Sequence, residues 1–286
     1  MNEVTGQLVK VTGASIYCAT RGSGPVVLIM GGGPSNADTL EPLASRLAED
    51  FAVVTYDRRG YSRSQLDDPH DPAGGELSGI QRHADDARQL IAALGAGPVS
   101  VFGTSFGALI ALELAATAPD AVGTVVVHEP PLGQVLAGDE RPPFDLNLGS
   151  EPDAGAALDA IAASVGVSRG RGSGGAVPAP ADVELFIRRD VPAIGGYRLD
   201  LGRLRPVAGR LVVTGSEGSR DYYPYQCARR LAGQLGTPLL ELPGDHAGMI
   251  RHPAEFATRL RSLLRPPDPA GTRPTEDYEG VTKCSS

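Results

Sequence analysis

Apolar and polar positions along this chain alternate between two periods, and their alternation predicts the fold. Solid apolar runs such as 25–30 (PVVLIM) and 98–103 (PVSVFG) are typical of strands that are buried on both faces. Stretches with apolar residues three and four positions apart, such as 81–94, predict amphipathic helices. Because strands and helices follow each other in turn, we expect a parallel sheet with helices on both of its faces.

The full pattern predicts about eight strands. They are expected at 7–11, 15–20, 25–30, 51–57, 98–103, 122–129, 209–215 and 238–244. Helices are expected at 39–50, 81–94, 106–118, 225–236 and 253–265. The predicted fold class is therefore α/β, with a mostly parallel, doubly wound sheet.

The alternation stops between residues 132 and 206. This segment is rich in Gly, Pro, Ala and Asp, and it holds only two weaker helical patterns, at 153–165 and 181–194. We expect a helical insertion after the strand 122–129, over one end of the sheet; the alternative is a variable surface loop region. The core would then comprise residues 1–131 and 207–265.

Composition and charge exclude several kinds of partner. The 286 residues are 41% hydrophobic and 21% charged, as is ordinary for a globular protein. A net charge of −8 argues against nucleic acid and anionic membrane surfaces, both of which require a basic patch. No apolar run reaches the ~18 residues of a membrane span, and the first residues do not read as a secretory leader.

Three scattered cysteines and five histidines form no metal-ligand pattern, so no metal is expected. An odd number of cysteines without a CxxC pair indicates reduced thiols and a cytoplasmic location. Residues 266–286 have almost no apolar content and are predicted to be a disordered tail. The Ala-, Gly- and Arg-rich composition is associated with bacterial genomes of high GC content. The sequence leaves open whether the protein forms a homodimer.

A serine lies at the junction between the strand 98–103 and the helix 106–118. The run Gly103-Thr104-Ser105-Phe106-Gly107 matches G-x-S-x-G, the motif of a nucleophile elbow between a strand and a helix. Its glycines leave room for a sharp turn whose central residue is strained. The alternative is a structural turn, but the correct strand and helix context favours Ser105 as a catalytic nucleophile.

A serine hydroxyl requires a base to take its proton, and His246 is the strongest candidate. It lies in a loop after the strand 238–244, at the carboxyl edge of the sheet. His252 instead begins the last helix, and His128 and His83 fit ordinary structural positions.

The oxyanion of an acyl-transfer reaction requires at least two donors. The backbone N–H of Phe106, which follows the nucleophile, is one candidate, and that of Gly32 in the loop Gly31-Gly32-Gly33-Pro34 is the other. The same loop begins like a dinucleotide fingerprint, but Asn36 stands where the third glycine is required. The chain also has no nucleotide P-loop, so no cofactor is expected.

Several motifs in order resemble those of the α/β-hydrolase family. They are GGGP (31–34), YDRRGYSRS (56–64), GTSFGA (103–108), HEPP (128–131) and PGDHAG (243–248), and the resemblance covers roughly residues 5–265 outside the insertion. In that family the insertion after the sixth strand is usually a cap that shapes the substrate pocket, which residues 132–206 match in position. The family's usual His-Gly before the oxyanion glycine is Met30-Gly31 here.

The family order of nucleophile, acid and histidine leaves the acid open. The acid usually follows the seventh strand, where this chain offers Glu217 and Asp221, but the usual aspartate position is Gly218. Some branches, such as haloalkane dehalogenases, place it after the sixth strand, where this chain has Glu129. Glu129 is preferred, followed by Glu217 and then Asp221.

These residues predict a serine hydrolase that cleaves an ester, thioester, lactone or related acyl bond of a small molecule through an acyl-enzyme on Ser105. A serine at the nucleophile position argues against haloalkane or epoxide opening, for which the family normally uses aspartate. The alternative is a lyase, a cyclase or a small-molecule binding protein of the same fold, with His246 as the base, because fold alone does not determine function.

Overall fold

The computed structural model of the chain describes residues 4–68, 79–136, 153–167 and 176–265. Its strands are β1 (Thr5–Val11), β2 (Ala14–Arg21), β3 (Val26–Met30), β4 (Ala52–Tyr56), β5 (Gln65–Leu66), β6 (Val99–Thr104), β7 (Val122–His128), β8 (Leu211–Ser216) and β9 (Leu239–Leu242). Its core helices are α1 (Glu41–Leu47), α2 (Gly79–Leu94), α3 (Phe106–Thr117), α7 (Tyr223–Leu235), α8 (Gly248–Arg251) and α9 (Pro253–Leu264).

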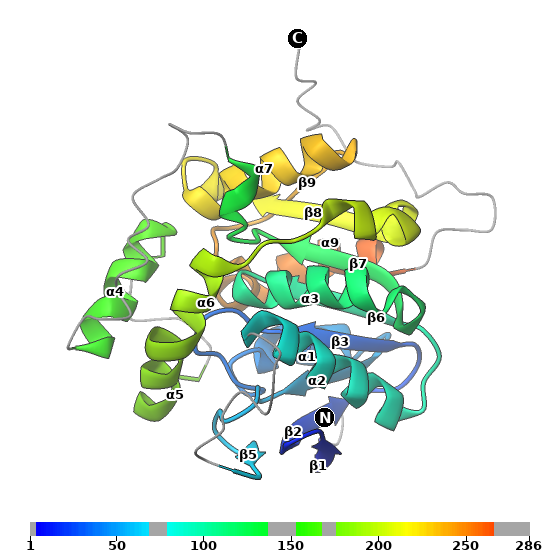
Figure 1. The fold of residues 1–286 in the computed structure, drawn as a ribbon. Coiled ribbons are helices and arrows are strands. Elements are labelled where there is room, and N and C mark those ends of the chain that lie inside the picture. Colours follow the sequence, from blue (N-terminus) through cyan, green and yellow to red (C-terminus); the bar gives the residue numbers. More distant parts are fainter. Residues whose placement is uncertain (1–3, 69–78, 137–152, 168–175, 266–286) are drawn as a thin grey trace.

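The strands form one mixed sheet in the order β1-β2-β4-β3-β6-β7-β8-β9, with β5 paired to β2. The pairs β1–β2, β2–β4 and β2–β5 are antiparallel. All pairs from β4 through β3 to β9 are parallel, as Figure 1 shows. The predicted α/β class with a mostly parallel sheet is confirmed, and β5 is the one described strand that the sequence pattern did not predict.

The continuous apolar runs are explained by burial on both faces of the sheet. In β3, Val27 and Ile29 belong to one hydrophobic cluster, whereas Leu28 and Met30 belong to the cluster on the other side. Successive strand side chains point to opposite faces, so a strand covered on both sides requires apolar residues at every position.

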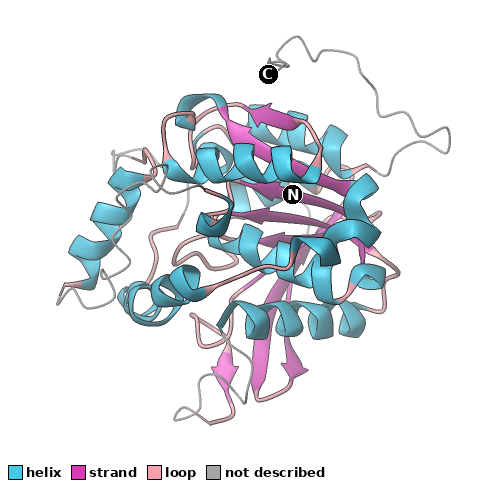
Figure 2. Ribbon diagram, turned by 45° about the horizontal axis from the view of Figure 1, so that its top comes forward, coloured by secondary structure: helices cyan, strands magenta, loops and turns pink. Residues whose placement is uncertain are grey.

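Helices cover both faces of the sheet, as Figure 2 shows. Residues of α2, α3 and α7 belong to one hydrophobic cluster, and residues of α1 and α9 to the other. Helix α3 is buried at every residue from Phe106 to Ala116. This burial explains why its sequence is apolar all round instead of amphipathic.

The segment after β7 contains the two weaker helical patterns predicted from the sequence. The first is α4 (Ala154–Ser164), and the second is α5 (Pro180–Leu185), the π-helical turn η5 (Phe186–Asp190) and α6 (Val191–Gly196). Figure 1 shows α4, α5 and α6 grouped beside one end of the sheet. A run of 3-10 helix, η6 (Leu201–Arg210), leads back to β8.

Two further predictions concern the C-terminal tail and membrane-spanning helices. The predicted disordered tail, residues 266–286, lies outside the described residues. In the part of the chain that the structure describes, no helix is long and apolar enough to cross a membrane.

Candidate active site

Ser105 occupies a strained turn between β6 and α3. Its backbone has φ 53° and ψ −121°, outside the conformations that a non-glycine residue ordinarily adopts. Two hydrogen bonds keep the backbone in this conformation. The Ser105 N–H donates to the His128 carbonyl at 2.8 Å, and the Ala108 N–H donates to the Ser105 carbonyl at 2.9 Å. A rigid strand and a rigid helix thus hold the hydroxyl in a fixed position.

The flanking glycines are required by close packing. A Cβ atom at Gly103 would lie 2.5 Å from the Gly107 carbonyl oxygen and 2.8 Å from the Ala111 Cβ in α3. A Cβ atom at Gly107 would clash with the backbone carbonyl of Met30 at the end of β3. The predicted reason for the glycines, clearance between strand and helix, is therefore confirmed.

The glycine loop (residues 31–34) follows β3 and lies against Ser105. A Cβ atom at Gly32 would approach the Ser105 Cβ to 2.7 Å and the Thr104 carbonyl oxygen to 2.8 Å. The Gly32 N–H has no partner among the backbone hydrogen bonds of the described loops. Phe106 is the first residue of α3, where N–H groups have no partner within the helix. The structure thus brings both predicted oxyanion donors to the nucleophile.

His246 lies in the loop between β9 and α8, and its Nδ1 is hydrogen-bonded to Glu129 Oε2. The loop is fixed by Asp245, whose side chain accepts a hydrogen bond from the Ala247 N–H at 2.9 Å and pairs with Arg251 at 2.6 Å. Since Nδ1 faces the carboxylate, Nε2 is the ring nitrogen left for chemistry.

Glu129 follows β7 with φ 49°, and its side chain is completely buried. It accepts hydrogen bonds from the Ser216 N–H at 2.7 Å and from the Ser219 hydroxyl, besides the contact with His246. Burial by itself raises the pKa of this carboxyl, but the neighbouring His128, His246 and Ser219 outweigh burial and lower the pKa to about 2. Glu129 is therefore a carboxylate at neutral pH.

The other two carboxylates considered for the acid are placed differently. Glu217 begins the 3-10 turn η7 (Glu217–Ser219), and both Glu217 and Asp221 are exposed. The end of β8 instead supplies the Ser216 N–H to Glu129, and the turn after it supplies the Ser219 hydroxyl. Ser219 is the residue after Gly218, which is the position of the usual aspartate. The sequence analysis did not predict the hydrogen bond from Ser219 to Glu129.

The remaining histidines have structural surroundings. His252 precedes α9, as expected. His128 is buried in β7, where its Nδ1 lies 3.0 Å from the Thr214 hydroxyl, and burial lowers its pKa to about 4. His83, in α2, is buried next to Asp190, with 3.5 Å between Nε2 and Oδ1. None of these three lines the pocket that contains Ser105, whereas His246 does.

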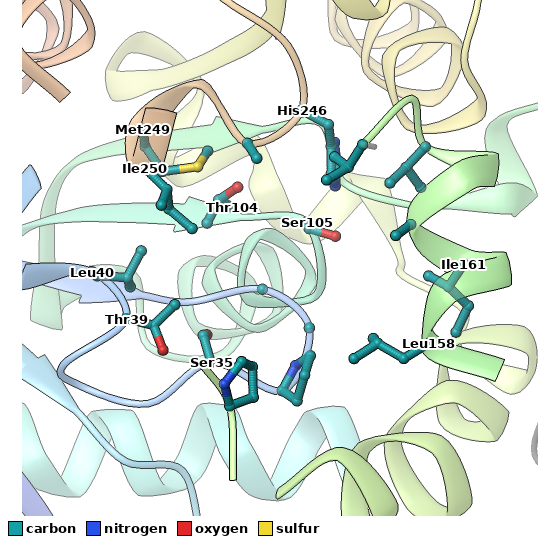
Figure 3. Close-up of a pocket in the computed structure, with 18 of the residues that line it drawn as sticks. Ser35, Thr39, Leu40, Thr104, Ser105, Leu158, Ile161, His246, Met249 and Ile250 are labelled. Carbon is teal, nitrogen blue, oxygen red and sulfur yellow. The ribbon is translucent and has the colours of Figure 1, made fainter. Parts of the chain in front are cut away.

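Ser105 and His246 open into a pocket of about 280 Å³. Figure 3 shows Ser105 near its centre, with His246 above it and Leu158 and Ile161 of α4 to the right. Among the described residues no hydrogen bond joins Ser105 to His246; in free enzymes this contact often tightens only when substrate binds. Much of the lining is apolar: Pro34, Leu40, Leu158, Ile161, Ala162, Val165, Val167, Ala176, Pro178, Phe186, Ala247, Met249 and Ile250.

Within the described ranges, no group of three or more His, Cys, Asp or Glu side chains could hold a metal ion. The arrangement combines a hydroxyl on a strained backbone, an imidazole that is oriented by a carboxylate and lines the same pocket, and the adjacent N–H groups of Gly32 and Phe106, which are the elements of acyl transfer through a serine.

Comparisons with known proteins identify the family of this chain. A family model described as the alpha/beta hydrolase fold matches residues 25–156. The chain is 34% identical over 269 residues to the uncharacterized hydrolase YraK of Bacillus subtilis (strain 168), covering 89% of this chain and 94% of that protein.

Solved structures show the same architecture. An alpha/beta hydrolase from Sphaerobacter thermophilus DSM 20745 matches with a TM-score of 0.68 and 25% identity, over 91% of this chain and all of that one. The N-acyl homoserine lactonase AidH matches with a TM-score of 0.66 at 19% identity, over 92% of this chain and 97% of that one.

Proposed function

This chain belongs to the α/β-hydrolase fold family, and we propose that it is a serine hydrolase that cleaves an ester, thioester, lactone or related acyl bond of a small molecule. One observation carries the proposal: strained Ser105 shares a pocket with His246, whose Nδ1 is held by the buried carboxylate Glu129. The same three residue types in these roles recur in unrelated serine hydrolases.

In the proposed reaction, Ser105 Oγ attacks the substrate carbonyl while His246 Nε2 takes its proton. The carbonyl oxygen becomes an oxyanion that accepts hydrogen bonds from the N–H groups of Gly32 and Phe106. His246 then gives the proton to the leaving group as the acyl–leaving-group bond breaks. Water attacks the acyl-enzyme with His246 again as base, which releases the carboxylic acid and restores Ser105.

Glu129 has a supporting role in this scheme. Its hydrogen bond to Nδ1 fixes the histidine tautomer, and its negative charge stabilises the imidazolium that forms during each half-reaction. The low pKa of Glu129 supports this role, because the acid must stay ionised while the histidine changes its charge.

The pocket lining supports an uncharged, apolar acyl substrate. Among the described residues of the lining, Arg251 is the only charged side chain besides the titratable His246, and Arg251 is already paired with Asp245 at 2.6 Å. A carboxylate or phosphate on the substrate would lose its hydration without gaining a free counter-charge. We assign residues 132–206 the role of the cap, because Leu158, Ile161 and Phe186 of this segment contribute to that lining.

Labelling by a fluorophosphonate probe, combined with hydrolysis of p-nitrophenyl esters, tests the proposal. We expect Ser105 to be labelled, and we expect butyrate and hexanoate esters to be cleaved at least about 100-fold more efficiently than the monoester of succinate, because burying one unpaired charge costs several kcal/mol. Ser105→Ala must abolish both labelling and hydrolysis.

The same variant distinguishes the alternative function. A lyase or cyclase that uses His246 as its base would keep much of its activity after Ser105→Ala, because its mechanism forms no bond to the hydroxyl. A folded wild-type protein that is not labelled and cleaves none of the esters would overturn the serine mechanism.

A further inference from the structure

Arg58 is a buried cation that lies between the glycine loop and the helices after β7. It follows β4, is 2% exposed, and donates from Nη1 to the Gly31 carbonyl at 3.0 Å and from Nη2 to the Gly33 carbonyl. Its Nη2 also lies 3.7 Å from Asp190 Oδ2 in η5. One guanidinium therefore holds the carbonyl groups of the two residues that flank Gly32.

The contact with Gly31 has a geometric consequence for the proposed oxyanion hole. The Gly31 carbonyl and the Gly32 N–H belong to the same peptide unit, which is planar and trans, so the two groups point in opposite directions. Fixing the carbonyl toward Arg58 therefore turns the Gly32 N–H away from Arg58. Three successive glycines have wide backbone freedom, and besides the contacts with Arg58 the described hydrogen bonds of this loop include the one from the Ser35 N–H to the Gly32 carbonyl at 3.2 Å.

Asp190 in turn holds Arg58 from the opposite direction. Its carboxylate accepts a hydrogen bond from Tyr61 Oη at 2.6 Å and from Arg189 Nε at 2.9 Å, and it is completely buried. The Arg58 guanidinium lies 4.3 Å from the centre of the Tyr61 ring and 5.2 Å from that of Phe106, the second proposed donor. Arg58 thus touches residues on both sides of the proposed oxyanion hole.

The loop after β4, which contains Arg58, contacts the helices after β7 at a second point. Asp182 in α5 accepts hydrogen bonds from the Ser62 N–H at 2.8 Å and from the Ser62 hydroxyl. The Arg189 guanidinium donates to the Arg59 carbonyl at 3.2 Å. The position of Asp190 relative to Arg58 is therefore set by several contacts with the loop after β4, and not by the ion pair alone.

We propose that Arg58 is a positioning residue that sets the Gly31–Gly32 peptide for oxyanion binding, and that Asp190 of the helices after β7 keeps Arg58 in place. This inference rests on the proposed serine mechanism and adds a residue to it. It also gives the segment 132–206 a second role, because its docking then influences catalysis as well as the shape of the pocket.

Arg58→Lys and Arg59→Lys form a matched pair of variants that tests the proposal. Arg59 is the next residue, is 1% exposed, and contacts Asp86 and the Thr12 carbonyl instead of the glycine loop. Lysine keeps the charge at both positions but lacks the two-pronged geometry of arginine. For each variant we would measure kcat and KM on a p-nitrophenyl ester, the Ki of a trifluoromethyl ketone, and the melting temperature.

The trifluoromethyl ketone reports on the oxyanion, because Ser105 adds to it and creates a negative oxygen. For Arg58→Lys we expect kcat to fall by about 10-fold or more, KM to change less than about threefold, and Ki to rise by the same factor as kcat falls. For Arg58→Met the loss approaches the 10²–10³-fold that removal of one oxyanion donor causes. Arg59→Lys is expected to lower the melting temperature without changing Ki.

The possible results separate this inference from the proposed function. Equal kcat and Ki in the two lysine variants would overturn the role of Arg58, as would a loss of kcat without a change in Ki, while a labelled, active wild type keeps the serine mechanism. A wild type that is neither labelled nor active overturns both. If Arg58→Met does not fold, the lysine pair still decides the matter.

Discussion

Two buried carboxylate–histidine pairs, Glu129–His246 and Asp190–His83, differ in what surrounds the histidine. Both carboxylates are completely buried, and both have pKa values below their ordinary range although burial alone would raise them. Glu129 is held by His246, by the Ser216 N–H at the end of β8 and by the Ser219 hydroxyl, whereas Asp190 is surrounded by cations and the Tyr61 hydroxyl. Each pair joins a carboxylate to a histidine, but the surroundings of the two pairs differ.

The histidines show the consequence of that difference. His246 contacts Glu129 through Nδ1 and lines the pocket with Ser105. His83 is 3% exposed, makes a T-shaped contact with Phe106 at 5.8 Å between ring centres, and has its Nδ1 buried with no hydrogen-bond partner among the described residues. A histidine can act as a base only if its second nitrogen reaches a substrate. Access to the pocket, rather than the carboxylate partner, separates the candidate catalytic pair from the structural pair.

The largest expected effect comes from the same substitution at the two histidines. His246→Gln is expected to lower kcat by about 10⁶-fold, as loss of the histidine does in serine triads, because no other His, Asp or Glu among the described residues lines the pocket of Ser105. His83→Gln is expected to keep kcat within about tenfold and to lower the free energy of unfolding by about 1–3 kcal/mol. Steady-state kinetics measure kcat for both variants, and urea unfolding measures their free energy of unfolding.

The distinction between a catalytic and a structural pair would be wrong if His83→Gln stays folded and loses activity as severely as His246→Gln. In that case Asp190–His83 would take part in the reaction. Circular dichroism and urea unfolding serve as the control here, since they show whether each variant is still folded, whereas labelling of Ser105 by the fluorophosphonate probe itself requires the base.

The next effect in size concerns the carboxylates. Glu129→Gln is expected to lower kcat by about 10⁴-fold, because a glutamine beside Nδ1 neither fixes the tautomer nor stabilises the imidazolium. Asp190→Asn is expected to cost less than about tenfold in kcat, since it acts on catalysis only through Arg58. Rates on one p-nitrophenyl ester give both numbers.

Glu217→Gln and Asp221→Asn complete that series as controls. Both residues are exposed, so neither change should alter kcat by more than about threefold. A large loss for Glu217→Gln together with a small loss for Glu129→Gln would transfer the acid's role to the turn after β8. If none of these carboxylate changes lowers kcat more than tenfold, the triad itself is wrong.

The smallest expected effect is a dependence of stability on pH. Burial lowers the pKa of His83 and brings that of His128 from 6.5 to about 4. The unfolded chain therefore binds protons that the folded chain does not, and stability, complete above about pH 6.5, is lost as the pH falls toward 4. His128 alone would account for about 3 kcal/mol of this loss.

Glu129 extends the same trend to lower pH. Its pKa falls from 4.5 to about 2, so the stability that it contributes is present above pH 4.5 and is lost between 4.5 and 2. Urea unfolding from pH 7 to 3 measures the histidine window and the upper part of the Glu129 window. His83→Gln should flatten the loss below pH 6.5 and leave the pH profile of activity unchanged; a shifted activity profile would mean that His83 communicates with the reaction.

Much of the core was predictable because each strand and helix has a local signature. The strand PVVLIM is apolar at every position since it is covered on both faces, and α3 is apolar all round since it is buried. The two-residue strand β5 and the four-residue helix α8 were not predicted, because such short elements have no period to detect. The π-helical turn at Phe186–Asp190 was likewise invisible within one helical pattern.

The site was partly predictable for the same reason. The elbow motif and the glycine loop are local, so Ser105, Phe106 and Gly32 were found directly. The loop after β9 identified His246 by its place in the chain order. Ser219, Arg58 and Asp190 were not predicted in their present roles, since their partners lie 90, 27 and 129 residues away in sequence.

The sequence by itself determined the fold class, the elbow and the succession along the chain of the strands that end at the candidate site, because these depend on residue periods and on local backbone clearance. The tertiary structure decided which carboxylate holds His246 and which histidine faces the pocket. It also placed Arg58 against the carbonyls that flank Gly32. Those choices depend on burial and on distances between segments far apart in the chain, and no local pattern encodes either.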